Sequence, residues 1–278
     1  MKHLFRAALC IMVCFTLASC VSGGSGNTDE QSLLFSTQGV DSVSVKVYRS
    51  DVEVRLWDKK DIFVVSESQN GEFHVCYING TTLLCKIDSS KESSRSKLRI
   101  FVPESFFADE WKISTVSGRI DVSQLWCDDC ELESTSGRIN LDRCEVNDLE
   151  VSSTSGRIQA DNLICSDESD FSSTSGAVRI SGILPQTEIN TTSGSIELNL
   201  LRPLVKDSSM SSLSGAIRIY MPENNGFELV YSSLSGRVTD EFTSFSGKGS
   251  GKTAYKNGRV KIEAETLSGA ISIKRTDD

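Results

Sequence analysis

The sequence of 278 residues contains nine cysteines but only two histidines. His3 lies in an N-terminal segment that we expect to be removed, which leaves His74 as the one histidine of the mature chain. A pair of histidines at metal-binding spacing is therefore missing, and a serine or cysteine nucleophile would have one candidate base. We expect no metal site, no cofactor and no catalytic residue, so the sequence favours a protein that is not an enzyme.

The thiol of Cys20 has the clearest predicted chemistry. Lys2 and Arg6 precede an apolar run over residues 7–18, which is too short to cross about 30 Å of hydrocarbon and typical of a signal peptide. The run closes on Leu17-Ala18-Ser19-Cys20, which looks like the lipobox of bacterial lipoproteins. The pattern predicts that residues 1–19 are removed and that Cys20 carries the lipid. The alternative is an ordinary secretory signal in which Cys20 is incidental.

Residues 20–32, rich in Ser and Gly, are predicted to form a flexible tether. The residue after Cys20 is Val21 and not Asp, which permits sorting to the outer membrane of a two-membrane envelope. Loss of residues 1–19 removes one Lys and one Arg and no acid, so the net charge of −9 becomes −11. An acidic chain without a basic cluster is a poor nucleic-acid binder. We expect the lipid on Cys20 to be its contact with the membrane.

The six cysteines after Cys20 are candidates for disulfide bonds, since an exported chain can meet an oxidising compartment. Cys76 and Cys85 flank Asn79-Gly80, a dipeptide typical of a two-residue hairpin loop. With that loop Cys76 faces Leu83 and Cys85 lies one diagonal step away, so a bridge needs a small shift of the strands. The other four lie within a repeated segment of the sequence and are expected in the loops that return from one repeat to the next. They are Cys127, Cys130, Cys144 and Cys165.

Cys127 and Cys165 share a register two repeats apart, about 9.6 Å, which is too far for a disulfide. Cys144 lies between them and could pair with either neighbour, so the pairing stays open. Cys127-x-x-Cys130 also has the spacing of half a zinc site, but the second pair that a structural zinc site needs is missing. A redox motif would need a βαβ context that the chain lacks.

Three further patterns could mark a site, and the first two are interpreted as ordinary structure. The segment Gly247–Thr253 resembles a phosphate-binding loop but has Ser246 where the motif needs its first Gly, so it is predicted to be a flexible loop. The acidic residues around Asp128 and Asp167 lack the regular offsets of calcium-binding repeats and are interpreted as solvated loops. Arg119, Arg138, Arg157 and Arg237 share one offset in the repeat. This row could bind an acidic glycan, or it could offset the negative charge of the chain.

The strands that position these side chains are expected to come from a repeated sequence motif. The dipeptide Ser-Gly recurs at intervals of 18–21 residues, with one longer final interval, and its glycines are Gly118, Gly137, Gly156, Gly176, Gly194, Gly215, Gly236 and Gly269. The residue two positions after each glycine is Ile or Val, and the residue three positions before it is Ser or Thr. A strict period of this length is typical of a solenoid that makes one turn in each repeat.

Apolar residues alternate with polar ones on both sides of each glycine, which indicates strands. The apolar phase shifts across the glycine, so we interpret Ser-Gly as the corner of a rung composed of strand, corner, strand and return loop. The predicted fold is an all-β, single-stranded β-solenoid over residues 111–278, with a hairpin insertion near 243–262. Residues 33–110 are predicted to form a β region that caps it. The alternative is an antiparallel β-sandwich.

The sequence resembles a bacterial β-strand-repeat family labelled "putative adhesin" and also called toastrack. The resemblance covers roughly residues 40–275. It rests on Asp51-Val52-Glu53-Val54, on Leu98–Pro103, on the serial Ser-Gly-x-Ile motifs and on the segment that ends at Thr266-Leu267-Ser268-Gly269. It implies a β-strand-repeat fold and no defined catalytic residues. Members also occur beside membrane-bound stress-response systems, which implies sensing as an alternative. The four cysteines among the repeats depart from the family pattern.

Together these observations predict a non-enzymatic lipoprotein of the cell envelope that presents a solenoid for adhesion or macromolecular binding. Its expected partners are the membrane, through Cys20, and a protein or glycan that the sequence does not name. A sensing or scaffolding subunit for envelope stress is the first alternative. A carbohydrate-active β-helix enzyme is the second.

Overall fold

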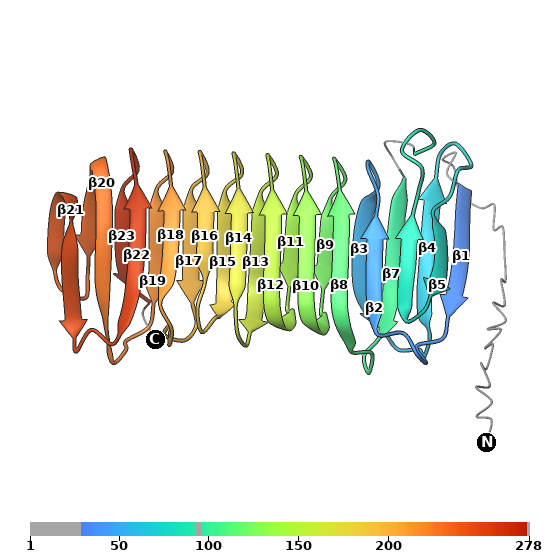
Figure 1. Ribbon diagram of the computed structural model, residues 1–278, viewed down its shortest axis with the longest axis horizontal. Coiled ribbons are helices and arrows are strands. Elements are labelled where there is room, and N and C mark those ends of the chain that lie inside the picture. Colours follow the sequence, from blue (N-terminus) through green and yellow to red (C-terminus); the bar gives the residue numbers. More distant parts are fainter. Residues whose placement is uncertain (1–28, 93–95, 277–278) are drawn as a thin grey trace, which may run out of the picture.

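The computed structural model describes residues 29–92 and 96–276, which form an elongated rod of strands (Figure 1). Residues 1–28, which include the predicted signal segment and Cys20, lie outside the described residues. The described part contains 23 strands and no helix, and so no helix that is long and apolar enough to cross a membrane. The all-β prediction is confirmed.

The strands follow one another along the rod with short connections from β8 to β19. Their bounds are β1 (Asp29–Phe35), β2 (Ser42–Lys46), β3 (Asp51–Trp57), β4 (Ile62–Ser68), β5 (Val75–Asn79), β6 (Thr82–Lys86), β7 (Lys97–Pro103), β8 (Ala108–Thr115), β9 (Ile120–Ser123), β10 (Trp126–Ser134), β11 (Ile139–Asp142), β12 (Glu145–Ser153), β13 (Ile158–Cys165), β14 (Ser169–Ser173), β15 (Val178–Ile183), β16 (Glu188–Thr191), β17 (Ile196–Leu200), β18 (Ser208–Ser212), β19 (Ile217–Met221), β20 (Gly226–Asp240), β21 (Phe245–Lys256), β22 (Val260–Thr266) and β23 (Ile271–Arg275).

Two parallel faces run the length of the rod. One face stacks β6, β2, β8, β10, β12, β14, β16 and β18, and the other stacks β7, β3, β9, β11, β13, β15, β17 and β19. Each Ser-Gly corner joins a strand of the first face to a strand of the second, so one repeat makes one rung. Equivalent residues lie in register, for example Ile139 beside Ile120 and Ile158. The predicted solenoid is confirmed.

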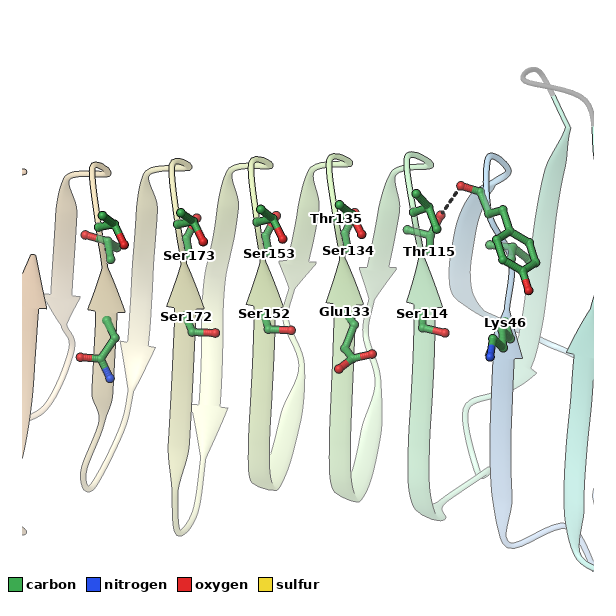
Figure 2. A pocket seen from close by; sticks show the side chains of 18 residues that line it. Lys46, Ser114, Thr115, Glu133, Ser134, Thr135, Ser152, Ser153, Ser172 and Ser173 are labelled. Atoms are coloured by element: carbon green, nitrogen blue, oxygen red, sulfur yellow. Dashed lines mark hydrogen bonds between the residues drawn. The ribbon is translucent and has the colours of Figure 1, made fainter. Parts of the chain in front are cut away.

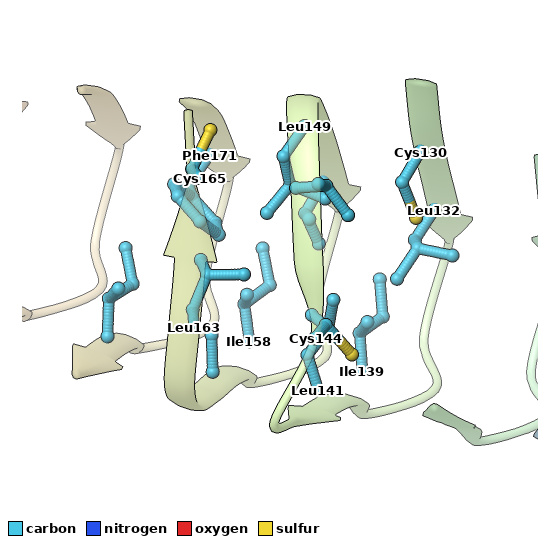
Figure 3. Close-up of a cluster of buried hydrophobic side chains, with 14 of the residues drawn as sticks. Cys130, Leu132, Ile139, Leu141, Cys144, Leu149, Ile158, Leu163, Cys165 and Phe171 are labelled. Atoms are coloured by element: carbon cyan, nitrogen blue, oxygen red, sulfur yellow. The ribbon is translucent and has the colours of Figure 1, made fainter. Parts of the chain in front are cut away.

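The interior of the rod consists of columns of apolar side chains, part of which Figure 3 shows. The residues two positions after the corner glycines have at most 1% of their surface exposed, and they are Ile120, Ile139, Ile158, Val178, Ile196, Ile217, Val238 and Ile271. β-branched side chains suit this position because they pack well on a pleated surface. One rung cannot bury such a face alone, so the columns bind the rungs together.

The return from one rung to the next contains a further corner and a short third side. Gln124, Arg143 and Asn162 occupy this corner in three successive rungs, each with φ between 54° and 57°. Successive return corners are joined by backbone hydrogen bonds. For example, the amide of Arg143 donates to the carbonyl of Asp161 in the next rung at 2.9 Å. The return is therefore an ordered stack over these rungs, where the sequence had indicated a simple loop.

The N-terminal end is closed by antiparallel strands. β4 pairs with β7, β1 pairs with β4, and β5 pairs with β6. β1 begins at Asp29, so the last residues of the tether predicted for 20–32 belong to this cap. The region 33–110 combines the cap with two rungs of the solenoid, β2–β3 and β6–β7.

The C-terminal rungs lie in an order that differs from the sequence. β22 pairs with β18 on one side and with β20 on the other, and β23 lies likewise between β19 and β20. The rung of Gly269 is therefore inserted between those of Gly215 and Gly236, which corrects the sequential stacking that the sequence suggested. β21 runs antiparallel to β20 and closes the end. Aromatic rings pack beneath it, with the centroids of Tyr231 and Phe245 5.2 Å apart.

Candidate functional site

Each Ser-Gly corner is held by a hydroxyl that the sequence places three residues before the glycine. The amide of Gly156 donates to Oγ of Ser153 at 2.8 Å, and the amide of Gly118 donates to Oγ1 of Thr115 at 3.1 Å. The same bond closes the corners at Gly137, Gly176, Gly215, Gly236 and Gly269. These hydroxyls are buried, so the bond satisfies an amide that water cannot reach.

Glycine is required at the corner because successive rungs touch there. A Cβ on Gly137 would lie 1.7 Å from the carbonyl oxygen of Gly118, and one on Gly156 would lie 1.8 Å from that of Gly137. The distance is at most 1.9 Å at all eight corner glycines. Their φ values are not positive, so the close approach of backbone, and not an unusual bend, excludes every other residue.

Exposed side chains form parallel columns along the corner edge. Two residues before the glycine the column contains Thr135, Thr154, Thr174 and Thr192, and one residue before it stands an exposed serine in each of the eight repeats. A groove runs beside this edge, and its wall includes Ser114, Glu133, Ser152 and Ser172 (Figure 2). Hydroxyls therefore repeat at the rung spacing of about 4.8 Å over a face open to solvent.

The threonine column becomes apolar toward the C-terminal end. Leu213, Leu267 and Leu234 follow in spatial order and are 51%, 47% and 77% exposed. They line a second groove together with Gly249 and Ser250 of β21. The edge thus has a hydroxyl-rich part and an apolar part.

The structure brings three of the four predicted arginines into neighbouring rungs. Arg119, Arg138 and Arg157 are exposed directly after their corner glycines. The amide of Ile120 donates to the carbonyl of Arg138 at 2.9 Å, and that of Ile139 donates to the carbonyl of Arg157 at 3.0 Å. Arg237 lies in the terminal rung, away from the others, where its Nη1 donates to Oγ of Ser246 at 3.0 Å.

Acidic side chains stack on the face of β10, β12, β14 and β16. Glu131, Glu150, Asp170 and Glu188 are register partners in consecutive rungs. Partial burial, followed by the charges of Glu188, Glu168 and Glu150, raises the pKa of Asp170. Asp128 and Asp129 lie in β10 and Asp170 lies in β14, so part of the predicted acidic loops is strand. Groups of side chains able to hold a metal ion are absent from residues 29–92 and 96–276.

His74 belongs to a buried chain of hydrogen bonds at the N-terminal cap. Its amide donates to Ser66 Oγ at 3.0 Å, Ser66 Oγ lies 2.6 Å from Nδ1, and Nε2 lies 2.9 Å from Ser50 Oγ. Ser50 Oγ donates to Glu92 Oε1 at 2.5 Å. Ser50 can then accept a hydrogen bond from His74, which requires a neutral imidazole with its proton on Nε2. Burial lowers the pKa of His74 to about 4, although Glu92 acts in the opposite direction.

A serine, a histidine and a glutamate joined by hydrogen bonds resemble a catalytic triad, but these three side chains are too deeply buried to contact a substrate. Ser50 is 0% exposed, His74 is 2% exposed and Glu92 is 3% exposed. Glu92 also accepts the amides of Tyr48, Arg49 and Ser50, at 2.7, 2.8 and 2.5 Å. Glu92 lies in the connection between β6 and β7, the neighbouring rung, and its carboxylate accepts the amides of this corner, whereas the corner amides of Thr135 and Ser136 donate to backbone carbonyls of the neighbouring corner.

The cysteines lie at the core and not on loops at the surface. Cys127 and Cys130 belong to β10, Cys165 ends β13, and Cys144 lies between β11 and β12; all four are buried (Figure 3 labels Cys130, Cys144 and Cys165). Burial raises the pKa of Cys144 and of Cys165 to about 11. A hydrogen bond with Cys127, together with burial, raises the pKa of Cys130. The prediction that all four lie in return loops is wrong for Cys127, Cys130 and Cys165, which lie in strands, whereas Cys144 lies in the connection between β11 and β12 as predicted.

Cys76 lies directly opposite Cys85, which corrects the predicted register. Asn79 pairs with Thr82, so the two-residue loop is Gly80-Thr81 and not Asn79-Gly80. The shift places the half-buried thiol of Cys76 against the buried thiol of Cys85. Both are free thiols in the structure. Burial and a hydrogen bond with Cys76 raise the pKa of Cys85 well above its usual value.

The segment Gly247–Thr253 forms the middle of β21, where a flexible loop was predicted. Gly247 and Gly251 face the aromatic side chains of Phe245 and Tyr231, and a Cβ on Gly251 would lie 2.7 Å from Oη of Tyr231, whereas Gly249 has a φ of 84° and open space around it. The small residues make room for rings, which accounts for the pattern without a phosphate ligand.

Sequence reasoning did not find two features of the site. The hydroxyl three residues before each glycine was visible as a constant Ser or Thr, but its bond to the glycine amide was not. The role of Glu92 had no periodic signal, because it caps a column that begins at Tyr48 and is contributed by a distant segment.

Comparisons with known proteins agree with this architecture. The sequence model of the Toastrack DUF4097 family matches residues 40–274. A solved structure described as a "putative adhesin" from Parabacteroides distasonis ATCC 8503 has a TM-score of 0.56 at 11% identity, covering 90% of this chain and 98% of its own. A "putative adhesin" from Bacteroides fragilis NCTC 9343 has a TM-score of 0.46 at 14% identity, covering 88% of this chain and 96% of its own. A search of the curated proteins found no match.

Proposed function

Because the chain belongs to the Toastrack DUF4097 family, we propose that it is a non-enzymatic protein of the cell envelope that presents its β-solenoid for adhesion or other macromolecular binding. The observation that carries the proposal is the set of exposed columns on the Ser-Gly edge. Side chains that repeat at one spacing along a rod offer the same contacts many times to an extended partner, as in other solenoid binding surfaces.

The proposed anchor is a lipid on Cys20, with the outer membrane as the expected location. Two or more acyl chains on one cysteine hold a protein stably at a membrane. The described rod begins at β1, nine residues after Cys20, so a short connection would join anchor and rod. The proposed partners are the membrane through this lipid, and an extended protein or glycan along the rod.

A binding role fits the site better than catalysis. The groove of Figure 2 is walled mainly by hydroxyls, with Glu133 as its carboxylate and Lys46 at one end. The histidine and serine that could form a nucleophile pair are buried in the cap. The description of the Parabacteroides distasonis structure as a "putative adhesin" is consistent with this proposal.

The exposed column of Leu213, Leu267 and Leu234 favours a second candidate, a scaffolding or sensing subunit that contacts another protein. Apolar side chains exposed side by side are typical of protein-interaction surfaces. In this candidate the C-terminal part of the edge would contact a membrane-bound regulator of envelope stress.

Proximity labelling in the native cell separates the two. A labelling enzyme fused after the C-terminal residue should mark surface or matrix proteins if the chain acts in adhesion. Marking of membrane kinases or regulators alone would overturn that proposal in favour of sensing. A parallel Cys20→Ser variant should leave the membrane fraction, and retention there would contradict the lipid anchor.

A further inference from the structure

The arginine column on the Ser-Gly edge is not required by the fold. In four other rungs the same position contains Ala177, Ser195, Ala216 and Ala270, and Arg237 occupies it in the terminal rung. Those rungs stack with the same register as the rungs of Arg138 and Arg157, and the three that contain alanine have the same bond from the glycine amide at their corners. A small residue is therefore sufficient for the solenoid, and the guanidinium groups need another explanation.

The column also places like charges in adjacent rungs. Arg119, Arg138 and Arg157 follow one another at the rung spacing of about 4.8 Å. Like charges at this separation repel each other, so the arrangement is unfavourable unless an anion lies along it. Arg49 adds a fourth exposed guanidinium at the neighbouring corner, one residue before Ser50.

Ion pairs within the chain neutralise only one end of the column. Nη1 of Arg119 lies 3.7 Å from Oδ2 of Asp121, and Asp51 lies beside it, since its Oδ1 accepts the amide of Arg119 at 2.7 Å. Arg138 and Arg157 make no ion pair with any carboxylate of residues 29–92 and 96–276. Two guanidinium groups thus remain uncompensated on a chain of net charge −9.

Hydroxyls accompany these charges across the edge. Ser136 and Thr135 precede the corner of Arg138, Ser155 and Thr154 precede that of Arg157, and all four side chains are exposed. Each of these two rungs thus presents a threonine hydroxyl, a serine hydroxyl and a guanidinium in line. A polysaccharide that lies along the rod would offer sugar hydroxyls and a repeated carboxylate or sulfate, which guanidinium binds in a bidentate manner.

We propose that the edge formed by the rungs of Gly118, Gly137 and Gly156 binds a linear anionic polysaccharide, aligned with the solenoid axis. This inference deepens the proposed binding function and rests on it. The guanidinium groups contact the carboxylate or sulfate groups, and the serine and threonine hydroxyls contact the sugar hydroxyls. Several weak contacts of one kind along one chain reinforce each other.

The test uses the full chain in detergent with three polymers: polygalacturonate for carboxylate, dextran sulfate for sulfate, and dextran as the uncharged control. Binding to one or both charged polymers and not to dextran is expected, and which polymer binds identifies the anionic group. The double variant Arg138→Ala/Arg157→Ala should weaken binding about tenfold or more and reduce its salt dependence. Alanine occurs naturally at this position, so the variant should keep the melting temperature of the parent.

The matched control is Arg179→Ala/Arg218→Ala, which removes the same charge from exposed positions outside the column. It should change binding less than about twofold, since long-range charge effects are screened by salt. Equal losses in the two double variants, or no binding to either charged polymer, would overturn the inference. The proposed function itself would survive that result if proximity labelling still marks surface or matrix proteins.

Discussion

The carbonyl oxygen of Ser50 lies where a side chain on Gly118 would begin, because a Cβ on Gly118 would stand 1.8 Å from that oxygen. Ser50 is the first residue of the corner column and itself has a side chain. Every later member is glycine, since each one rests on the carbonyl of the member before it. The position of one residue in the stack thus decides whether a Cβ is tolerated.

Gly156→Ala should destabilise the solenoid by about 3 kcal/mol or more, because backbone atoms on both sides must move to admit the methyl group. The measurement is denaturant unfolding followed by circular dichroism. Ser155→Ala is the control, since its exposed hydroxyl can be lost with a change within about 0.5 kcal/mol. Equal stability of the two variants would contradict the contact between rungs.

Ser153→Ala should cost about 1–3 kcal/mol, because it leaves the buried amide of Gly156 without its acceptor. Ser153→Thr should restore the stability, since Thr115 and Thr266 make the same bond in their rungs. Thermal unfolding of the three proteins checks the order. A Ser153→Thr protein as unstable as Ser153→Ala would show that the hydroxyl is not the cause.

The stability should depend on pH through His74. Its pKa is about 4 in the folded chain against 6.5 as the ordinary value, so the unfolded chain takes up a proton first as the pH falls. The stabilisation is complete above about pH 6.5 and is lost as the pH falls toward 4, by about 3 kcal/mol in total. His74→Gln should flatten this part of the stability curve in urea unfolding. An unchanged slope would refute the assignment to His74.

Cys76 and Cys85 should be the first thiols to form a disulfide in an oxidising envelope, because they are direct cross-strand partners and Cys76 is accessible. The two thiols would lose two protons and two electrons to a disulfide-bearing oxidant of the envelope. Alkylation and mass spectrometry, with and without reductant, should show a bridge in peptides containing these residues. Cys85→Ala is expected to leave Cys76 alkylated. Six alkylated thiols in freshly exported protein would contradict the bridge.

The sequence by itself determined the rung, because every repeat must bury the same positions against its neighbour. The constant Ile or Val after the glycine and the alternation around it predict strands, a corner and an all-β stack. These signals are local and recur, so each copy reinforces the others. The alignment of Arg119, Arg138 and Arg157 followed from the same period.

The tertiary structure alone decided what depends on contacts between distant or irregular segments. The insertion of β22–β23 before β20 has no local signal, since the Ser-Gly motif of a rung does not specify which rung lies beside it. The pairing of Cys76 with Cys85 required the true hairpin loop, and a change of one residue in the loop changes every cross-strand partner. The burial of Cys127 arises near the corner before β10, and the capping by Glu92 arises at the first corner of the column. At these places the repeat of the sequence gives no prediction. The arrangement of the side chains there depends on which backbone groups still need hydrogen-bond partners and on the space around the backbone.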